Sequence, residues 1–249
     1  MTLVIDINIH TTSYAEAVKR IYSWSKAGES RAVYATNVHV LMEAWDSQDF
    51  RSHMNNADLV TPDGMPLVWI MRWKGQRDQQ RVYGPTLMLH VLEAAAREKI
   101  QVGFYGGTCE VLAALVQRMK DRFEGLEVVF EHSPPYYELS PQEDAETVEQ
   151  INRSGARILF VGLGCPKQEI WMAKQRGRVR AVMLGVGAAF DFHAGVKPQA
   201  PAWMQAIGLE WLFRLASEPR RLWKRYLYHN PRFVLLAAAD LLGLLKKVD

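Results

Sequence analysis

Hydrophobic and polar positions along the chain alternate between two patterns. Short, nearly unbroken apolar runs predict strands at residues 32–36, 58–61, 101–105, 126–131, 156–162 and 181–186. Apolar residues at helical spacing predict helices at residues 14–27, 38–46, 66–73, 86–98, 111–122, 141–152 and 168–175. Residues 3–9 alternate like one further strand. Strands that are apolar on both faces and alternate with helices predict an α/β fold, with a mainly parallel sheet covered by helices on both faces in a Rossmann-like core.

The last part of the chain has a different pattern. Residues 203–249 carry eight Lys and Arg against four Asp and Glu, whereas residues 1–202 carry 22 against 23. On a helical wheel over residues 220–228, four cations share one arc and four apolar side chains share the opposite arc. The cations are Arg220, Arg221, Lys224 and Arg225, and the apolar residues are Leu222, Trp223, Tyr226 and Leu227. Such a helix suits an anionic membrane surface or a diphosphate, and the alternative is an ordinary surface helix packed on the core.

Asn230 and Pro231 predict the start of a second helix, because asparagine caps helices and proline favours their first turn. Residues 233–245 are apolar apart from Asp240 and Gly243, and Lys246 and Lys247 follow. A helix of this length rises about 20 Å, whereas spanning a bilayer takes roughly 20 residues. We therefore expect an α/β catalytic core over residues 1–199 and, over residues 200–249, a basic amphipathic appendage that associates with a membrane without crossing it.

The composition of the chain further limits the classes of protein to which it can belong. About half of the 249 residues are apolar, which is enough for one large domain with an appendage. The first ten residues lack the basic start and long apolar run of a signal peptide, so we expect a cytoplasmic protein, peripheral on the inner face of the cell membrane.

The two cysteines, Cys109 and Cys165, lie far apart, and the seven histidines show no metal-ligand spacing. Reduced thiols, no metal site, no cofactor and no nucleic-acid partner are expected, and a homo-oligomer remains compatible with the sequence.

Polar and glycine residues follow several of the predicted strands, at the sheet edge where α/β proteins bind ligands. The glycine-bearing turns contain Gly106, Gly107, Gly162, Gly164, Gly185 and Gly187, and Asp191 lies just beyond the last of them. Such turns let backbone N–H groups approach a phosphate, although each alone can be merely structural. Neither a complete dinucleotide fingerprint nor a P-loop motif is present. A nucleotide ligand is therefore compatible with the sequence, whereas a dinucleotide cofactor or ATP hydrolysis is not supported.

Asp63 is the strongest candidate for a catalytic base, since it follows an apolar strand and precedes Gly64. An ordinary Asp-Gly turn is the alternative. A partly buried carboxylate there would have a raised pKa and take a proton from an acceptor hydroxyl, with Asn37 holding the carboxylate or a sugar. Arg81 and Lys167 are candidates for neutralising a diphosphate leaving group. Because the chain lacks an Asp-x-Asp pair, we expect cations and backbone dipoles, rather than a bound metal ion, to stabilise that group.

Several motifs together resemble the WecG/TagA/CpsF glycosyltransferase family. They are TPDGMP at 61–66, RVYG at 81–84, GLGCPKQE at 162–169, the segment 185–201, GLEWLFRL at 208–215 and EPRR at 218–221. The similarity runs from about residue 5 to residue 233. It implies a metal-independent, inverting transferase on the cytoplasmic face. Such an enzyme moves N-acetylmannosamine, its uronic acid or another hexose from a UDP-sugar to a polyprenyl-diphosphate-linked saccharide in cell-surface polysaccharide biosynthesis.

The resemblance also assigns roles to particular residues. Asp63 matches the proposed base of the family, and Asn37, Arg81 and Gln168 match residues that contact substrate. Glu169 belongs to the same motif as Gln168 and is included among the substrate-binding candidates. The appendage arginines of the family match Arg214 and Arg221, and we assign Arg220, Lys224 and Arg225 to the membrane or the lipid diphosphate.

The chain departs from the family pattern at three positions: Thr86 replaces a common Asp, Gln199 a frequent Arg, and Ala35 a Thr of some members. The sugar and the acceptor saccharide therefore stay open. The rival interpretation is a non-catalytic nucleotide-binding regulatory protein that docks on membranes. Such a protein would keep the glycine turns and the basic helix but would not need Asp63.

Overall fold

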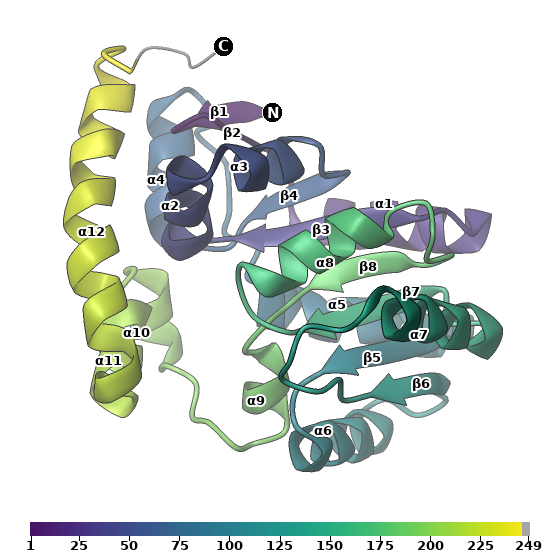
Figure 1. Cartoon of the computed structure of the whole chain (residues 1–249). Coiled ribbons are helices and arrows are strands. Elements are labelled where there is room, and N and C mark those ends of the chain that lie inside the picture. Colours follow the sequence, from purple (N-terminus) through teal and green to yellow (C-terminus); the bar gives the residue numbers. More distant parts are fainter. Residues whose placement is uncertain (246–249) are drawn as a thin grey trace.

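The computed structural model describes residues 1–245, and a six-stranded parallel sheet forms its centre (Figure 1). In order across the sheet, the strands are β4 (Leu59–Pro62), β3 (Arg31–Thr36), β8 (Val182–Gly185), β7 (Ile158–Gly162), β5 (Val102–Gly106) and β6 (Val128–His132). Every neighbouring pair runs parallel. Val33 and Tyr34, adjacent in β3, enter two different core clusters. Both faces of the sheet are thus buried, which explains the unbroken apolar strands and confirms the predicted α/β fold.

Helices cover the two faces separately. One face packs against α1 (Tyr14–Ala27), α5 (Gly84–Glu98), α6 (Cys109–Arg122) and α9 (Ala189–His193). The other packs against α2 (Val38–Asp46), α3 (Gln48–Asn55), α4 (Met65–Trp73), α7 (Pro141–Ser154) and α8 (Lys167–Gln175). Helix α7 begins with the predicted capping box between Ser140 and Glu143.

Residues 3–9 do not form the single strand that their alternation predicted. They form an antiparallel hairpin of β1 (Thr2–Val4) and β2 (Ile7–Ile9), apart from the main sheet. Ile5 and Asp6 turn the chain with φ of 46° and 61°. Alternation persists through a two-residue turn of this kind, so the pattern alone could not reveal the reversal. Ile5, despite its place in the turn, is fully buried in the core cluster.

The segment after α9 forms α10 (Ala202–Ala206), α11 (Glu210–Ser217) and the long helix α12 (Pro219–Leu241). The prediction of a new helix starting at Pro231 is wrong, because α12 runs continuously through that residue. His229, Phe233 and Ala237, spaced by four residues, form one buried stripe that continues past the proline. Pro231 itself is exposed, where water can satisfy the carbonyl that loses its helical partner. Lys246 and Lys247 lie outside the described residues.

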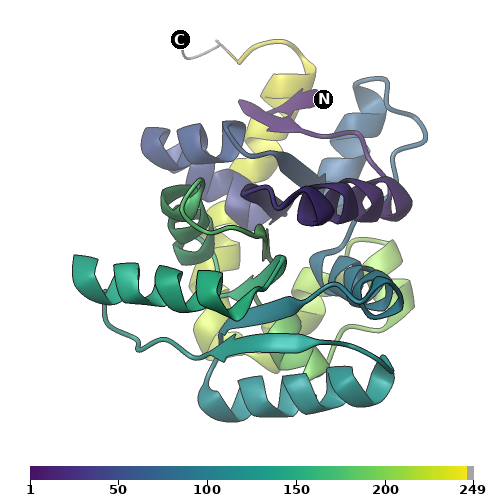
Figure 2. The same cartoon turned by 90° about the vertical axis from the view of Figure 1, so that its right-hand side faces the viewer.

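Helix α12 stands at the carboxyl ends of the strands and contacts α2 and α4 (Figure 1). Seen from the amino ends of the strands, it lies behind the sheet (Figure 2). Asp240 fastens its last turn: the carboxylate is 2.6 Å from the Lys74 ammonium and accepts a hydrogen bond of 3.1 Å from the backbone N–H of Ile5. Phe233 and Ala237 join the main core cluster. The appendage therefore completes the core instead of forming a second one.

The predicted division of the basic helix into two arcs is only partly correct. Leu222 is buried, and Tyr226 lines a cavity together with Arg221 and Arg225. Trp223 and Leu227, expected on the packed side, are 48% and 69% exposed. Within residues 1–245, no helix is both long and apolar enough to span a bilayer.

Candidate active site

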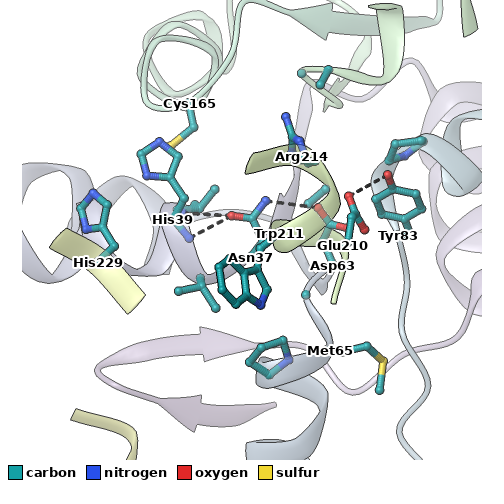
Figure 3. Close-up of a pocket in the computed structure, with 18 of the residues that line it drawn as sticks. Asn37, His39, Asp63, Met65, Tyr83, Cys165, Glu210, Trp211, Arg214 and His229 are labelled. Carbon is teal, nitrogen blue, oxygen red and sulfur yellow. Dashed lines mark hydrogen bonds between the residues drawn. The ribbon is translucent and has the colours of Figure 1, made fainter. Parts of the chain in front are cut away.

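A cavity of ≈ 840 Å³ lies between the carboxyl ends of the strands and helices α11 and α12 (Figure 3). The core supplies its floor and side walls from the turns after β3, β4, β7 and β8. The appendage supplies the opposite wall, which includes Glu210, Trp211 and three arginines. Apolar side chains such as Trp69 and Phe233 border the polar part. A ligand with a polar head and an apolar remainder would fit this division.

Asp63 lies at the floor of this cavity, directly after β4. Its backbone N–H donates to the Thr36 carbonyl at 2.8 Å, which fixes the carboxylate beside the end of β3. Burial raises the pKa of Asp63, and the opposing effect of Arg81 is smaller. Among the described residues, Oδ1 has no hydrogen-bond partner. The side chain is thus a buried carboxylate whose Oδ1 lies 3.5 Å from the Arg81 guanidinium without a hydrogen bond.

Asn37 connects Asp63 to helix α2. Its side-chain oxygen caps the helix by accepting from the N–H groups of His39 and Val40 at 3.0 and 3.3 Å. Because this oxygen is engaged, the amide nitrogen must point the other way, and it lies 3.5 Å from Oδ2 of Asp63 (Figure 3). A Cβ on Gly64 would come within 3.4 Å of Asn37. The small residue therefore permits the close approach of the two turns.

Arg81 joins the core to the appendage. Its Nε donates to the backbone carbonyl of Asp63, and its terminal nitrogen lies 2.6 Å from Glu210 and 3.5 Å from Oδ1 of Asp63. The hydroxyl of Tyr83 donates to the other oxygen of Glu210 at 3.0 Å, and the Arg81 guanidinium stacks 3.9 Å from the Tyr83 ring. The guanidinium thus lies between two carboxylates and contacts both of them.

The glycine turns have mixed roles. Five of the six predicted glycines line the cavity, namely Gly107, Gly162, Gly164, Gly185 and Gly187. Gly106 does not line it: a Cβ there would lie 2.6 Å from the backbone of Gly162, so this glycine is required by strand packing. Gly164 has φ of 79° with open space beside it. Its N–H donates to the side-chain oxygen of Gln168 at 3.2 Å, so this turn positions an amide rather than leaving its donor free for a phosphate.

Gln168 lines the cavity and is held from behind by its neighbour Glu169. The Gln168 amide nitrogen donates to Glu169 at 2.8 Å, which together with the Gly164 bond fixes the orientation of the amide. Glu169 is completely buried and does not line the cavity; burial raises its pKa to about 7. Lys167 is exposed and also lies outside the lining. The motif therefore brings only Gln168, of these three residues, to the cavity.

Three arginines of the appendage face the cavity: Arg214, Arg221 and Arg225. Arg221 is paired with Glu218 at 2.6 Å, and Asp191 is paired with Lys197 at 2.8 Å, both at the cavity rim. Burial lowers the pKa of Arg225, and the charge of Arg221 adds to the effect. Arg220 and Lys224 point to solvent and do not line the cavity. The cations of α12 are thus divided between the cavity and the outer surface.

The family model of the WecG/TagA/CpsF glycosyl transferases matches residues 2–247. The chain belongs to this family. It is similar to two N-acetylglucosaminyldiphosphoundecaprenol N-acetyl-beta-D-mannosaminyltransferases, from Bacillus spizizenii strain W23 and Bacillus subtilis strain 168. The identities are 29% over 229 residues and 28% over 231 residues, covering 92% of this chain and 86% of each relative.

Two of the three departures from the family pattern border the site. Ala35 lines the cavity, and Gln199 lies 3.4 Å from the Tyr83 hydroxyl, beside Glu210. Thr86 is not among the lining residues. Of Thr86 and Gln199, the two departures expected near the cleft, only Gln199 therefore contacts a residue that lines the cavity.

Sequence reasoning missed Glu210, Tyr83 and the histidines of the cavity wall. Glu210 is an acidic residue among the mostly apolar residues of the GLEWLFRL motif. This contrast could have marked it as a candidate site residue. His39 is on α2 and His229 on α12, and both line the cavity. Their ring centroids are 5.3 Å apart although they are far apart in sequence. The histidines show no metal-ligand spacing in the sequence, and the approach of this pair depends on the packing of α12 against α2, which no spacing rule could show.

Proposed function

We propose that this family member is an inverting transferase that moves an N-acetylmannosamine-type hexose from a UDP-sugar to a polyprenyl-diphosphate-linked saccharide. The names of the two Bacillus relatives support the sugar and the acceptor. The single observation that carries the mechanism is the buried carboxylate of Asp63, whose Oδ1 makes no hydrogen bond among the described residues, on a cavity walled by arginines.

Asp63 is the general base in this proposal. The acceptor hydroxyl gives its proton to the Asp63 carboxylate while its oxygen attacks the anomeric carbon of the donor sugar. The bond from that carbon to the diphosphate oxygen breaks on the opposite side, and UDP leaves with the electron pair. Burial raises the pKa of Asp63, which makes its carboxylate a stronger base than an exposed one.

Cations of the protein stabilise the departing diphosphate. Arg214, Arg221 and Arg225 line the wall opposite the core turns, and guanidinium groups bind phosphate oxygens in bidentate fashion. Arg81 is committed to Asp63 and Glu210, so it orients the base and closes the space between the carboxylates. Transfer is therefore expected to need no metal ion at this centre.

The outer surface of the appendage is proposed to lie on the inner face of the cell membrane. Exposed apolar side chains gather on α10 to α12, including Trp203, Trp223, Leu227 and Leu235, next to the exposed cations Arg220 and Lys224. Aromatic and aliphatic residues enter the headgroup boundary while cations attract anionic lipids. This placement would bring the lipid-linked acceptor to the open side of the cavity.

Incubation with a panel of UDP-sugars and a short-chain GlcNAc-diphosphate-lipid tests the proposal. We expect mass spectrometry to show one added N-acetylhexosamine or hexosaminuronic acid residue, and NMR to show a β-linkage formed from an α-linked donor. Tight binding of UDP-sugars without transfer to any such acceptor would favour the regulatory alternative.

A further inference from the structure

Three potential metal ligands meet where the appendage crosses helix α2. His39 and Glu43 lie one turn apart on α2, and His229 comes from α12. Nδ1 of His39 is 3.6 Å from Oε1 of Glu43, and Nε2 of His229 is 3.4 Å from the same oxygen. All three ligand atoms lie within 4.8 Å of one another. Figure 3 shows the two imidazole rings side by side, away from Asp63.

The imidazoles have buried nitrogens without a partner. Among the described residues, neither ring nitrogen of His39 nor Nδ1 of His229 makes a hydrogen bond. Buried polar atoms in proteins nearly always have a hydrogen-bond partner, and an ion held beside Glu43 would supply one for Nδ1 of His39.

We infer that His39, Glu43 and His229 form a zinc-binding site that clamps α12 onto α2. Zinc binds imidazole nitrogen and carboxylate oxygen at about 2.0–2.2 Å, so tetrahedral ligands stand roughly 3.3–3.6 Å apart. The two separations to Glu43 match this spacing without movement. Two imidazoles and one carboxylate also favour Zn²⁺ over Mg²⁺ or Ca²⁺, which prefer oxygen ligands.

The surrounding charges decide what completes the site. Glu43 supplies the single negative charge of the three ligands, whereas Arg225 and Arg214 line the same cavity as the two histidines. The positive charges of these arginines repel a divalent cation. An anion or a water molecule would therefore fit best as the fourth ligand of the zinc ion. His39 and His229 both line the cavity, which leaves that fourth position open to it. The inference does not depend on Asp63 or on the proposed transfer reaction.

Calorimetric titration of the chelator-treated, full-length protein with ZnCl₂ tests the site. We expect one zinc ion per chain and at least roughly 100-fold weaker binding in Glu43→Gln and in His229→Gln, since the loss of even an outer partner of a ligand costs 10- to 100-fold. His90→Gln is the matched control. It removes the histidine of an exposed His90–Glu93 pair, 4.0 Å apart on one helix, and should bind zinc like the wild type.

Thermal melts of the same proteins separate a lost site from a lost fold. Zinc should raise the melting temperature of the wild type and of His90→Gln but not of Glu43→Gln or His229→Gln, with metal-free melts close to one another. Absence of zinc binding to the wild type would overturn the inference. So would unchanged affinity in both ligand variants, or loss of binding on replacing the exposed thiol in Cys109→Ser instead.

Discussion

The guanidinium of Arg81 in the core and the carboxylate of Glu210 in the appendage are 2.6 Å apart, and this pair ties the two walls of the cavity together. Glu210 also acts on the base: its negative charge raises the pKa of Asp63, in addition to the larger effect of burial. A general base works in its ionised form, so activity should fall as pH drops through the pKa of Asp63.

Replacing Glu210 by glutamine should therefore move the acid limb of the pH–rate profile to lower pH. The amide can still contact Arg81 and Tyr83 but no longer disfavours ionisation of Asp63. The measurement is kcat against pH, with the exposed Glu93→Gln as control. An acid limb that stays where it is in the wild type would contradict the role of Glu210.

Asp63→Asn should lower turnover by roughly 10²- to 10⁴-fold, the typical contribution of a general base. The amide keeps the size of the carboxylate, so UDP binding by calorimetry and the melting temperature should change little. Asp121→Asn, on the exposed surface of α6, is the control. Near wild-type turnover of Asp63→Asn with a good acceptor would remove Asp63 from the mechanism.

The arginines that line the cavity should matter far more than the exposed one beside them. Arg214→Gln or Arg225→Gln is expected to lower kcat/KM by about 10- to 150-fold, since a hydrogen bond to a charged group contributes about 1.5–3 kcal/mol. Arg220→Gln, one residue from Arg221 but facing solvent, should retain activity toward a water-soluble acceptor. Equal losses in lining and exposed variants would argue against a diphosphate at this wall.

Membrane binding should depend on the outer surface of α12. Together, Arg220→Gln and Lys224→Gln should weaken binding to anionic vesicles by about 2 kcal/mol, or roughly 30-fold, and the effect should shrink at high salt. Trp223→Gln with Leu227→Gln should weaken it regardless of salt, because burial at the headgroup boundary is apolar. Vesicle flotation measures both, with Tyr136→Gln, exposed before α7, as control. Flotation that none of these changes affects would place the contact elsewhere.

Sugar transfer should persist in excess EDTA. Arg81 fills the space between Asp63 and Glu210, so no metal ion is needed to balance these carboxylates. The sharper test uses Glu43→Gln, which removes the inferred zinc site without touching the cavity lining. Complete loss of transfer by that variant on chelation, restored by Mn²⁺ or Mg²⁺, would contradict metal-independent catalysis.

The sequence predicted the parallel sheet and its flanking helices because local periodicity reports burial directly. In β3, Ala32 and Tyr34 enter one core cluster and Val33 enters the other, and an unbroken apolar run is the signature of that environment. The hairpin of β1 and β2 escaped prediction because its turn at Ile5 and Asp6 interrupts neither alternation nor hydrophobicity. Alternation of apolar and polar residues looks the same whether the backbone continues straight or reverses.

The sequence predicted those residues of the candidate site that belong to local motifs. Asn37 and Asp63 directly follow strands, Gln168 lies in the first turn of the helix after β7, and Arg81 precedes α5. All four line one cavity. The joining of Arg81 to Glu210 could not be foreseen, since it depends on how α11 packs 129 residues later in the chain. The approach of His39 to His229 could not be foreseen either, because it also depends on tertiary packing. Arg225 faces the cavity because it lies on the same side of α12 as the buried stripe, which the sequence alone did not identify.

Asp240, bonded to Ile5 and Lys74, is synthesised after both of the residues that it contacts. All six strands of the sheet have emerged once residue 185 has left the ribosome, yet the arginine wall, Glu210 and the anchoring carboxylate are still to come. A nascent chain halted before α12 would carry Asp63 in an open groove, with Phe233 and Ala237 missing from its core. The cavity is thus complete only after α12 has been made, because a chain stopped before this helix would lack Arg221 and Arg225.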